Sequence, residues 1–89
     1  MTLLHAKLNP PLSHWQGKYA WIVGASSGIG RATAEALHAQ GAQVIVSARD
    51  ADALHELAKG RDGFVVVPLD VTEPETLAAA KLKVQACVD

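Results

Sequence analysis

Residues 20–49 contain a glycine-rich turn between two apolar runs, and this segment constrains the fold more than any other part of the chain. The first run is Trp21-Ile22-Val23, a helical stretch begins near Ile29, and the second run covers residues 44–48. Continuous apolar runs of this length are typical of strands buried on both faces of a parallel sheet. The order strand, turn, helix, strand predicts a βαβ unit.

Three glycines, Gly24, Gly28 and Gly30, occupy the turn. We expect Gly24 to let the chain leave the strand, Gly28 to let the backbone approach a ligand, and Gly30 to let the helix pack on the sheet. The free N–H groups of the first helical turn and the helix dipole favour an anion. The arrangement predicts a site for a dinucleotide pyrophosphate. The alternative is a glycine turn that only connects a strand to a helix.

The rest of the chain continues this alternation. The helix that starts near Ile29 is expected to run to Gln40 and to end at Gly41 in a left-handed conformation. Asp50 is expected to cap a second helix that ends at Gly60. The expected strands are residues 19–23, 44–48 and 64–69.

A third helix is expected after the third strand. Thr72 and Glu75 have the spacing of a capping box. Its apolar residues are Leu77, Ala80, Leu82 and Val84. With right-handed crossovers, the order β-α-β-α-β-α predicts the N-terminal half of an α/β, Rossmann-like doubly wound fold with parallel strands in the order 3-2-1. Residues 18–89 would form this incomplete dinucleotide-binding domain, and residues 1–17 a partly disordered leader.

The sequence Val-Gly-Ala-Ser-Ser-Gly-Ile-Gly, followed by Arg-Ala-Thr-Ala-Glu-Ala-Leu and Gly-Ala-Gln-Val-Ile-Val, resembles the N-terminal third of a short-chain dehydrogenase/reductase. The resemblance covers residues 15–80. One departure is Val23, because the family usually has threonine before the first glycine. The resemblance implies that Ser26, Ser27 and Ile29 join the three glycines around the cofactor.

The end of the second strand favours NADP(H) over NAD(H). NAD-selective sites have an acidic residue here that accepts hydrogen bonds from the ribose hydroxyls, whereas NADP sites provide a cation for the 2′-phosphate. This chain has Ala48 at the position where NAD-preferring relatives have aspartate, followed by Arg49. The Arg49 guanidinium could bind the phosphate and the Ser47 hydroxyl could add a hydrogen bond. Alternatively, Arg49 is a solvated residue beside Asp50.

Two further cofactor residues follow from the resemblance alone. In the family, an aspartate at the end of the third strand binds the adenine amino group and the next residue contacts the ring. Asp70 and Val71 occupy these positions. Without the resemblance, Asp70 would be read as a turn residue, which aspartate favours.

The catalytic elements of the family do not occur in these 89 residues. The family uses a serine and a Tyr-x-x-x-Lys pair, but the single tyrosine, Tyr19, is followed four residues later by Val23. We assign no catalytic residue. Two hypotheses stay open: the cofactor-binding part of an NADP(H)-dependent oxidoreductase acting on carbonyls or alcohols, truncated before its catalytic residues, and a self-contained, non-catalytic dinucleotide-binding or interaction module.

Composition limits the partners. The formal net charge is -1, with no basic run that would attract nucleic acid or an anionic membrane. The four histidines lack metal-site spacing, so no metal is expected. The single cysteine, Cys87, excludes an internal disulfide and favours the cytoplasm. Because the first strand would be an open apolar edge, we expect self-association through it.

Overall fold

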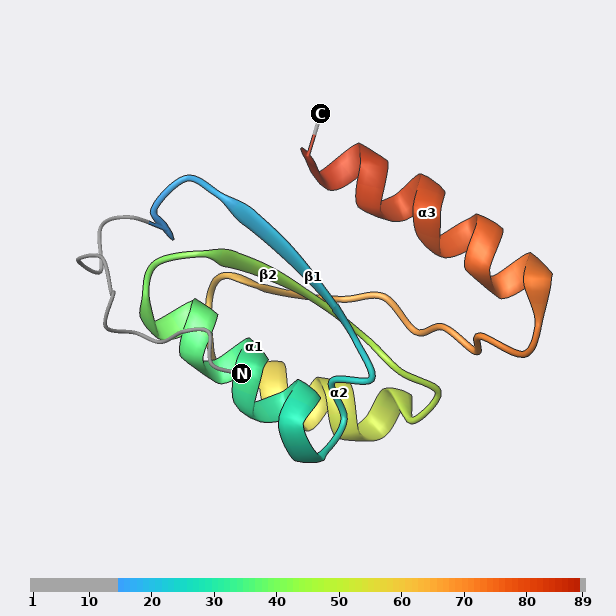
Figure 1. The fold of residues 1–89 in the computed structure, drawn as a ribbon, viewed down its shortest axis with the longest axis horizontal. Coiled ribbons are helices and arrows are strands. Elements are labelled where there is room, and N and C mark those ends of the chain that lie inside the picture. The colour runs from blue at the N-terminus through green and yellow to red at the C-terminus, as the bar shows by residue number, and fades with distance from the viewer. Residues whose placement is uncertain (1–14, 89) are drawn as a thin grey trace.

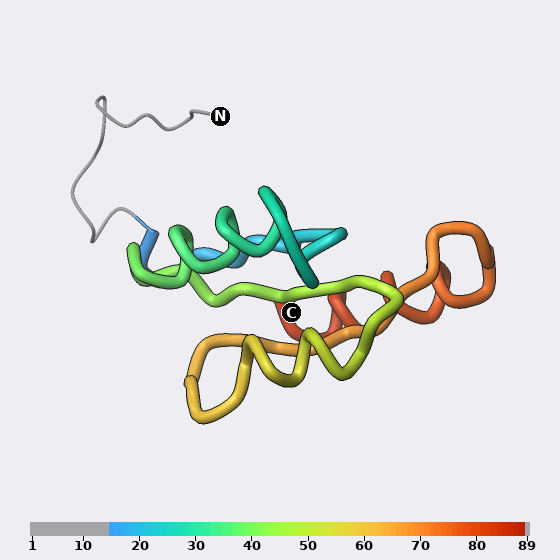
Figure 2. The backbone as a smooth tube through the Cα atoms, turned by 90° about the horizontal axis from the view of Figure 1, so that it is seen from below, coloured from blue at the N-terminus to red at the C-terminus, as the bar shows by residue number. Residues whose placement is uncertain are grey.

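The computed structural model describes residues 15–88, which form a three-stranded parallel sheet with helices on both faces (Figure 1). The elements in chain order are β1 (Tyr19–Val23), α1 (Gly28–Ala39), β2 (Gln43–Ser47), α2 (Ala51–Ala58), β3 (Phe64–Val66) and α3 (Pro74–Val88). The colour gradient in Figure 2 follows this alternation along the backbone. The strand order is β1-β2-β3 with parallel pairing throughout, which confirms the predicted Rossmann-like topology.

The central strand β2 separates two apolar clusters. On one face, Val44 and Val46 pack with Leu54 and Leu57 of α2 and with Ala34 of α1. On the other face, a second cluster forms where β2 and the segment after β3 meet α3. Its buried residues are Ile45, Val67, Leu69 and Ala80. Partly buried side chains pack against them, among them Trp21, Leu77, Val84 and Cys87. The side chains of Val44, Ile45 and Val46 are at most 1% exposed. Full burial on both faces explains the unbroken apolar run in β2.

The first strand is less buried than its sequence predicts. Tyr19 and Val23 are 46% and 48% exposed, and the three residues between them are half-buried. Within the described residues β1 pairs only with β2, so it is the edge of the sheet. The apolar run therefore marks a strand with one open edge.

The third strand and third helix differ from their predicted bounds. β3 ends at Val66 rather than Leu69, although the N–H groups of Val67 and Leu69 still donate to Val46 and Ala48. Pro68 between them has no N–H to continue a regular ladder. The expected capping box does not form, because α3 begins at Pro74 and the Thr72 hydroxyl donates to Asp70 instead. Proline is favoured at a first helical position.

Other local expectations concern the helices and the leader. Leu82 is 73% exposed, and the buried face of α3 consists of Leu77, Ala80, Val84 and Cys87. Gly41 has a φ of 97° after α1, as expected for its cap. Residues 15–17 form a turn closed by a hydrogen bond from Lys18 N–H to Trp15 O, and Trp15 packs against the first cluster. The rest of the expected leader, residues 1–14, lies outside the described residues.

A polar contact links α1 to the turn before β3. The Arg61 guanidinium makes two hydrogen bonds to the Glu35 carboxylate, at 2.6 and 3.0 Å. These bonds, together with the charge of Arg61, hold the pKa of Glu35 below its ordinary value. His38 stacks on Phe64 with ring centroids 4.2 Å apart. These contacts lie near the amino ends of the strands and leave the carboxyl ends open.

In the part of the chain described, none of the helices is long and apolar enough to cross a membrane.

Candidate cofactor-binding site

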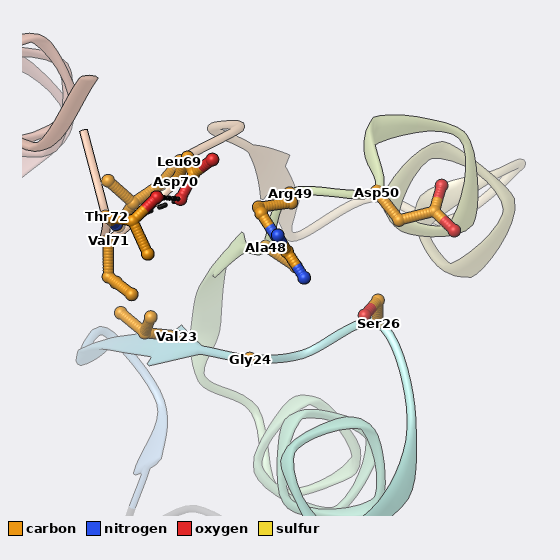
Figure 3. A pocket seen from close by; sticks show the side chains of 10 residues that line it. All are labelled: Val23, Gly24, Ser26, Ala48, Arg49, Asp50, Leu69, Asp70, Val71 and Thr72. Carbon is orange, nitrogen blue, oxygen red and sulfur yellow. Dashed lines mark hydrogen bonds between the residues drawn. The ribbon is translucent and has the colours of Figure 1, made fainter.

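A cavity of about 710 Å³ lies at the carboxyl ends of the strands (Figure 3). Parallel strands bring the loops that follow them to one edge of the sheet, where ligands bind in open α/β folds. The loops after β1, β2 and β3 all contribute to the lining. The lining residues are Val23, Gly24, Ser26, Ala48, Arg49, Asp50, Leu69, Asp70, Val71 and Thr72.

The glycine-rich turn has the geometry that its sequence predicts. Gly24 and Gly28 have φ values of 85° and 62°, which residues with a side chain rarely adopt. A Cβ on Gly30 would lie 2.2 Å from the Gly24 carbonyl oxygen, so only glycine fits there. At Gly28 a Cβ would meet nothing within 4 Å. The backbone at Gly28 therefore borders open space that a phosphate group could occupy.

The first turn of α1 is open to an anion. Ser27 is the N-cap residue, but its side chain makes no hydrogen bond to the helix, and no acidic residue lies in the first turn. Unsatisfied N–H groups and the positive end of the dipole remain there. Ile29 is 80% exposed beside them. Ser26 lines the cavity, whereas Ser27, Gly28, Ile29 and Gly30 carry the same turn into α1.

The end of β2 brings a cation to the cavity. Figure 3 shows the Arg49 side chain extending from β2 between the glycine-rich turn and the loop of Asp70. Within residues 15–88, Arg49 is exposed and its guanidinium forms no ion pair or hydrogen bond. The neighbouring carboxylate of Asp50 caps α2 by accepting a hydrogen bond from Ala53 N–H at 3.0 Å. Asp50 is therefore held by the helix rather than by Arg49.

Ser47 lies away from this cavity. It is fully buried, and its hydroxyl accepts a hydrogen bond from the Trp21 indole N–H at 2.9 Å. Ser47 is opposite Val23 in the register of β1 and β2, and Trp21 is two residues before Val23. The hydroxyl therefore faces the α3 side of the sheet, and Ser47 is not among the residues that line the cavity, so we do not propose the expected cofactor contact.

The loop after β3 places Asp70 and Val71 against the cavity. The Asp70 carboxylate accepts hydrogen bonds from the N–H and the hydroxyl of Thr72, at 2.9 and 2.6 Å. These two bonds, with the charge of Arg49 as a smaller contribution, hold the pKa of Asp70 below its ordinary value. The Thr76 hydroxyl bonds to the Asp70 N–H and lies 2.7 Å from the Asp70 carbonyl oxygen. Val71 is 66% exposed and offers an apolar surface.

Sequence reasoning missed the roles of Thr72 and Thr76. Thr72 was assigned to a capping box, although an Asp-x-Thr sequence also allows a turn in which the aspartate accepts from the residue two positions later. That signal could have identified the contact between Asp70 and Thr72.

Tyr19, the single tyrosine of the sequence, does not line this cavity. Tyr19 lies at the start of β1, at the amino ends of the strands, whereas the cavity lies at their carboxyl ends. Among residues 15–88, no group of three or more histidine, cysteine, aspartate or glutamate side chains could hold a metal ion.

Comparison with known proteins identifies the family. Residues 18–88 match the family described as short chain dehydrogenase. This chain belongs to the short-chain dehydrogenase family. The family consists of oxidoreductases that bind a nicotinamide dinucleotide, and the match covers both the glycine-rich turn and the loop of Asp70.

Three similar proteins illustrate the match. An uncharacterized oxidoreductase of Staphylococcus haemolyticus is 43% identical over 83 residues, covering 88% of this chain and 36% of that protein. The solved structure of a 3-ketoacyl-(acyl-carrier-protein) reductase from Brucella melitensis, in complex with NADH, has a TM-score of 0.77 at 28% identity, covering 82% of this chain and 30% of that one. A Brucella melitensis structure named ribose-5-phosphate isomerase has a TM-score of 0.78 at 42% identity, covering 83% and 28%.

This chain spans roughly a third of the length of these relatives, from 28% to 36%. The two structures also carry names for different reactions, and a shared fold does not define a reaction.

Proposed function

We propose that this chain forms the NADP(H)-binding part of a short-chain dehydrogenase that transfers hydride between NADP(H) and a carbonyl or alcohol. The observation that carries the proposal is the unpaired Arg49 guanidinium at the cavity. The residue before it, Ala48, has no carboxylate for a ribose hydroxyl, and the Asp50 carboxylate caps α2. A guanidinium that forms no ion pair or hydrogen bond within residues 15–88 favours a phosphate over a ribose diol.

Other residues in and beside the cavity have roles consistent with this proposal. The open backbone at Gly28 and the uncapped start of α1 would hold the pyrophosphate. Asp70 would accept a hydrogen bond from the adenine amino group, and Val71 would contact the ring. The bound dinucleotide would supply or accept the hydride.

Calorimetric titration of the 89-residue chain with NADPH and with NADH tests the proposal. We expect NADPH to bind at least about tenfold more tightly, because one charge-assisted phosphate contact contributes about 1.5–3 kcal/mol. Equal affinities, or tighter binding of NADH, would contradict the preference. Absence of binding by a folded chain would contradict the site as a whole.

The 89-residue chain should bind cofactor without turning it over, because it lacks the Tyr-x-x-x-Lys pair. NADPH absorbance should stay constant with a panel of ketones and aldehydes. Turnover would reveal a catalytic group that the sequence does not indicate. Binding without turnover fits both open hypotheses, the dehydrogenase part and the self-contained module. Sequencing the gene distinguishes them, because a Tyr-x-x-x-Lys pair encoded after residue 89 would support the dehydrogenase.

We propose that isolated chains self-associate through β1. The outer edge of β1 has no strand partner within residues 15–88, and Tyr19 and Val23 are about half exposed on it. Unpaired edge strands with apolar side chains tend to pair with another chain. Sedimentation velocity at micromolar concentration should show dimers. Tyr19→Lys should shift the chain to monomers, whereas Leu82→Lys, a control on α3, should not; a monomeric wild-type chain would contradict the proposal.

Two expectations from composition stay predictions. A cytoplasmic location was inferred from the single cysteine. The absence of nucleic-acid and membrane partners was inferred from the near-neutral charge.

A further inference from the structure

The carboxylate of Asp70 is fixed before any ligand arrives. Its Oδ1 atom accepts two hydrogen bonds from Thr72, one from the backbone N–H at 2.9 Å and one from the hydroxyl at 2.6 Å (Figure 3). The Asp70 backbone is held separately, because the Thr76 hydroxyl at the start of α3 bonds to its N–H at 3.0 Å. Thr76 therefore holds the backbone of Asp70, and Thr72 orients its carboxylate through both its backbone N–H and its hydroxyl.

The two oxygens of the Asp70 carboxylate differ in their hydrogen bonds. Oδ1 is occupied by Thr72, whereas Oδ2 accepts no hydrogen bond within residues 15–88. Asp70 and Thr72 both line the cavity, and Asp70 is only partly exposed. An ionised carboxylate is purely an acceptor, so its free oxygen selects a ligand that donates a hydrogen bond.

We propose that Thr72 is a positioning residue for the purine ring: it fixes the Asp70 carboxylate so that Oδ2 accepts from the 6-amino group of adenine. The proposal rests on the NADP(H) site proposed above and deepens it. Thr72 does not touch the purine in this scheme, and it acts only through Asp70. A carboxylate held in one rotamer loses less side-chain entropy when the ligand binds.

The electrostatics of the loop support this role. The hydrogen bonds from Thr72 are the largest cause of the lowered pKa of Asp70. A carboxyl group with a lowered pKa stays ionised, and able to accept, further into the acidic range. Removing the Thr72 hydroxyl should raise this pKa, so that cofactor binding weakens at a higher pH than in the wild type.

The test compares wild type, Thr72→Val and Thr72→Ser against two dinucleotides. The first is NADPH, and the second is its hypoxanthine analogue, in which a carbonyl oxygen replaces the 6-amino group. Thr72→Val keeps the shape of the side chain and loses the hydroxyl, whereas Thr72→Ser keeps the hydroxyl. We expect Thr72→Val to weaken NADPH binding about three- to tenfold, with Thr72→Ser within about twofold of wild type. The hypoxanthine dinucleotide should bind equally weakly to all three.

The outcomes separate this inference from the proposed function. Suppose that wild type binds NADPH, but that Thr72→Val weakens the binding of both dinucleotides equally or leaves both affinities unchanged. Thr72 is then not a positioning residue for the amino group. If folded wild type binds no dinucleotide, the proposed site fails and the inference with it. NMR titration of the Asp70 carboxyl in the cofactor-free chain gives an independent measurement. Its pKa should be higher in Thr72→Val than in wild type and Thr72→Ser, and an unchanged value would overturn the inference.

Discussion

Replacing Gly28 by valine should abolish dinucleotide binding, with a loss of at least about a hundredfold for both NADPH and NADH. The valine side chain would enter the open space beside the Gly28 backbone, where the pyrophosphate is proposed to lie. Loss of two charge-assisted hydrogen bonds, each about 1.5–3 kcal/mol, gives an effect of this size. Calorimetric titration with both dinucleotides measures it.

The control must reproduce the backbone strain without touching the site. Gly28 has a φ of 62°, which disfavours valine even in the absence of ligand. Gly60 offers a matched position, with a φ of 70° and nothing within 4 Å of an added Cβ. It lies after α2, ahead of β3, and does not line the cavity. Gly60→Val should therefore bind cofactor like wild type, and unchanged affinity in Gly28→Val would refute the phosphate-binding turn.

Arg49→Ala should weaken NADPH binding by about tenfold or more and leave NADH binding nearly unchanged. The guanidinium has no partner within the described residues, so its removal leaves no unpaired group in the protein. The cost is then the lost phosphate contact, about 1.5–3 kcal/mol. The two dissociation constants, measured at one salt concentration, give the ratio directly, since exposed charges are screened by salt.

Lys59→Ala is the control for the loss of one positive charge. Lys59 ends α2, away from the cavity lining. Its removal changes the net charge as Arg49→Ala does, and it should affect NADPH and NADH alike and only slightly. An equal loss of both cofactors in Arg49→Ala would contradict the assignment of this residue to the 2′-phosphate.

The parts of the fold that could be predicted from sequence are those set by local signals. Apolar runs located β1 and β2 to within a residue, and Asp50 caps α2 as its position indicates. The predicted bounds of β3 and α3 were wrong because two local signals competed at each of these places. Thr72 precedes an acidic helix start, but α3 begins at Pro74 and the Thr72 hydroxyl donates to the Asp70 carboxylate instead of capping the helix. Pro68 interrupts the ladder of an otherwise apolar run.

The site was less predictable where partners are distant in sequence. The hydroxyl of Ser47 is taken by Trp21, which is 26 residues away, and only the register of β1 on β2 brings the two together. The same separation applies to Glu35 and Arg61. Arg49 lines the cavity, and its place there was predictable because the end of a strand is itself a local feature. Local patterns show which residues reach the carboxyl edge of the sheet, and pairing determines which of their groups remain free.

The cavity is assembled from loops that follow three different strands, and in the unfolded chain these loops are not held together. A dinucleotide that spans them would bind the folded state and hardly bind the unfolded state. At a hundred times its dissociation constant, such a ligand adds about 2.7 kcal/mol to the free energy of unfolding. Since small domains have total stabilities of about 5–15 kcal/mol, this is a large share. The cellular supply of free dinucleotide would then help to set how long each polypeptide escapes proteolysis.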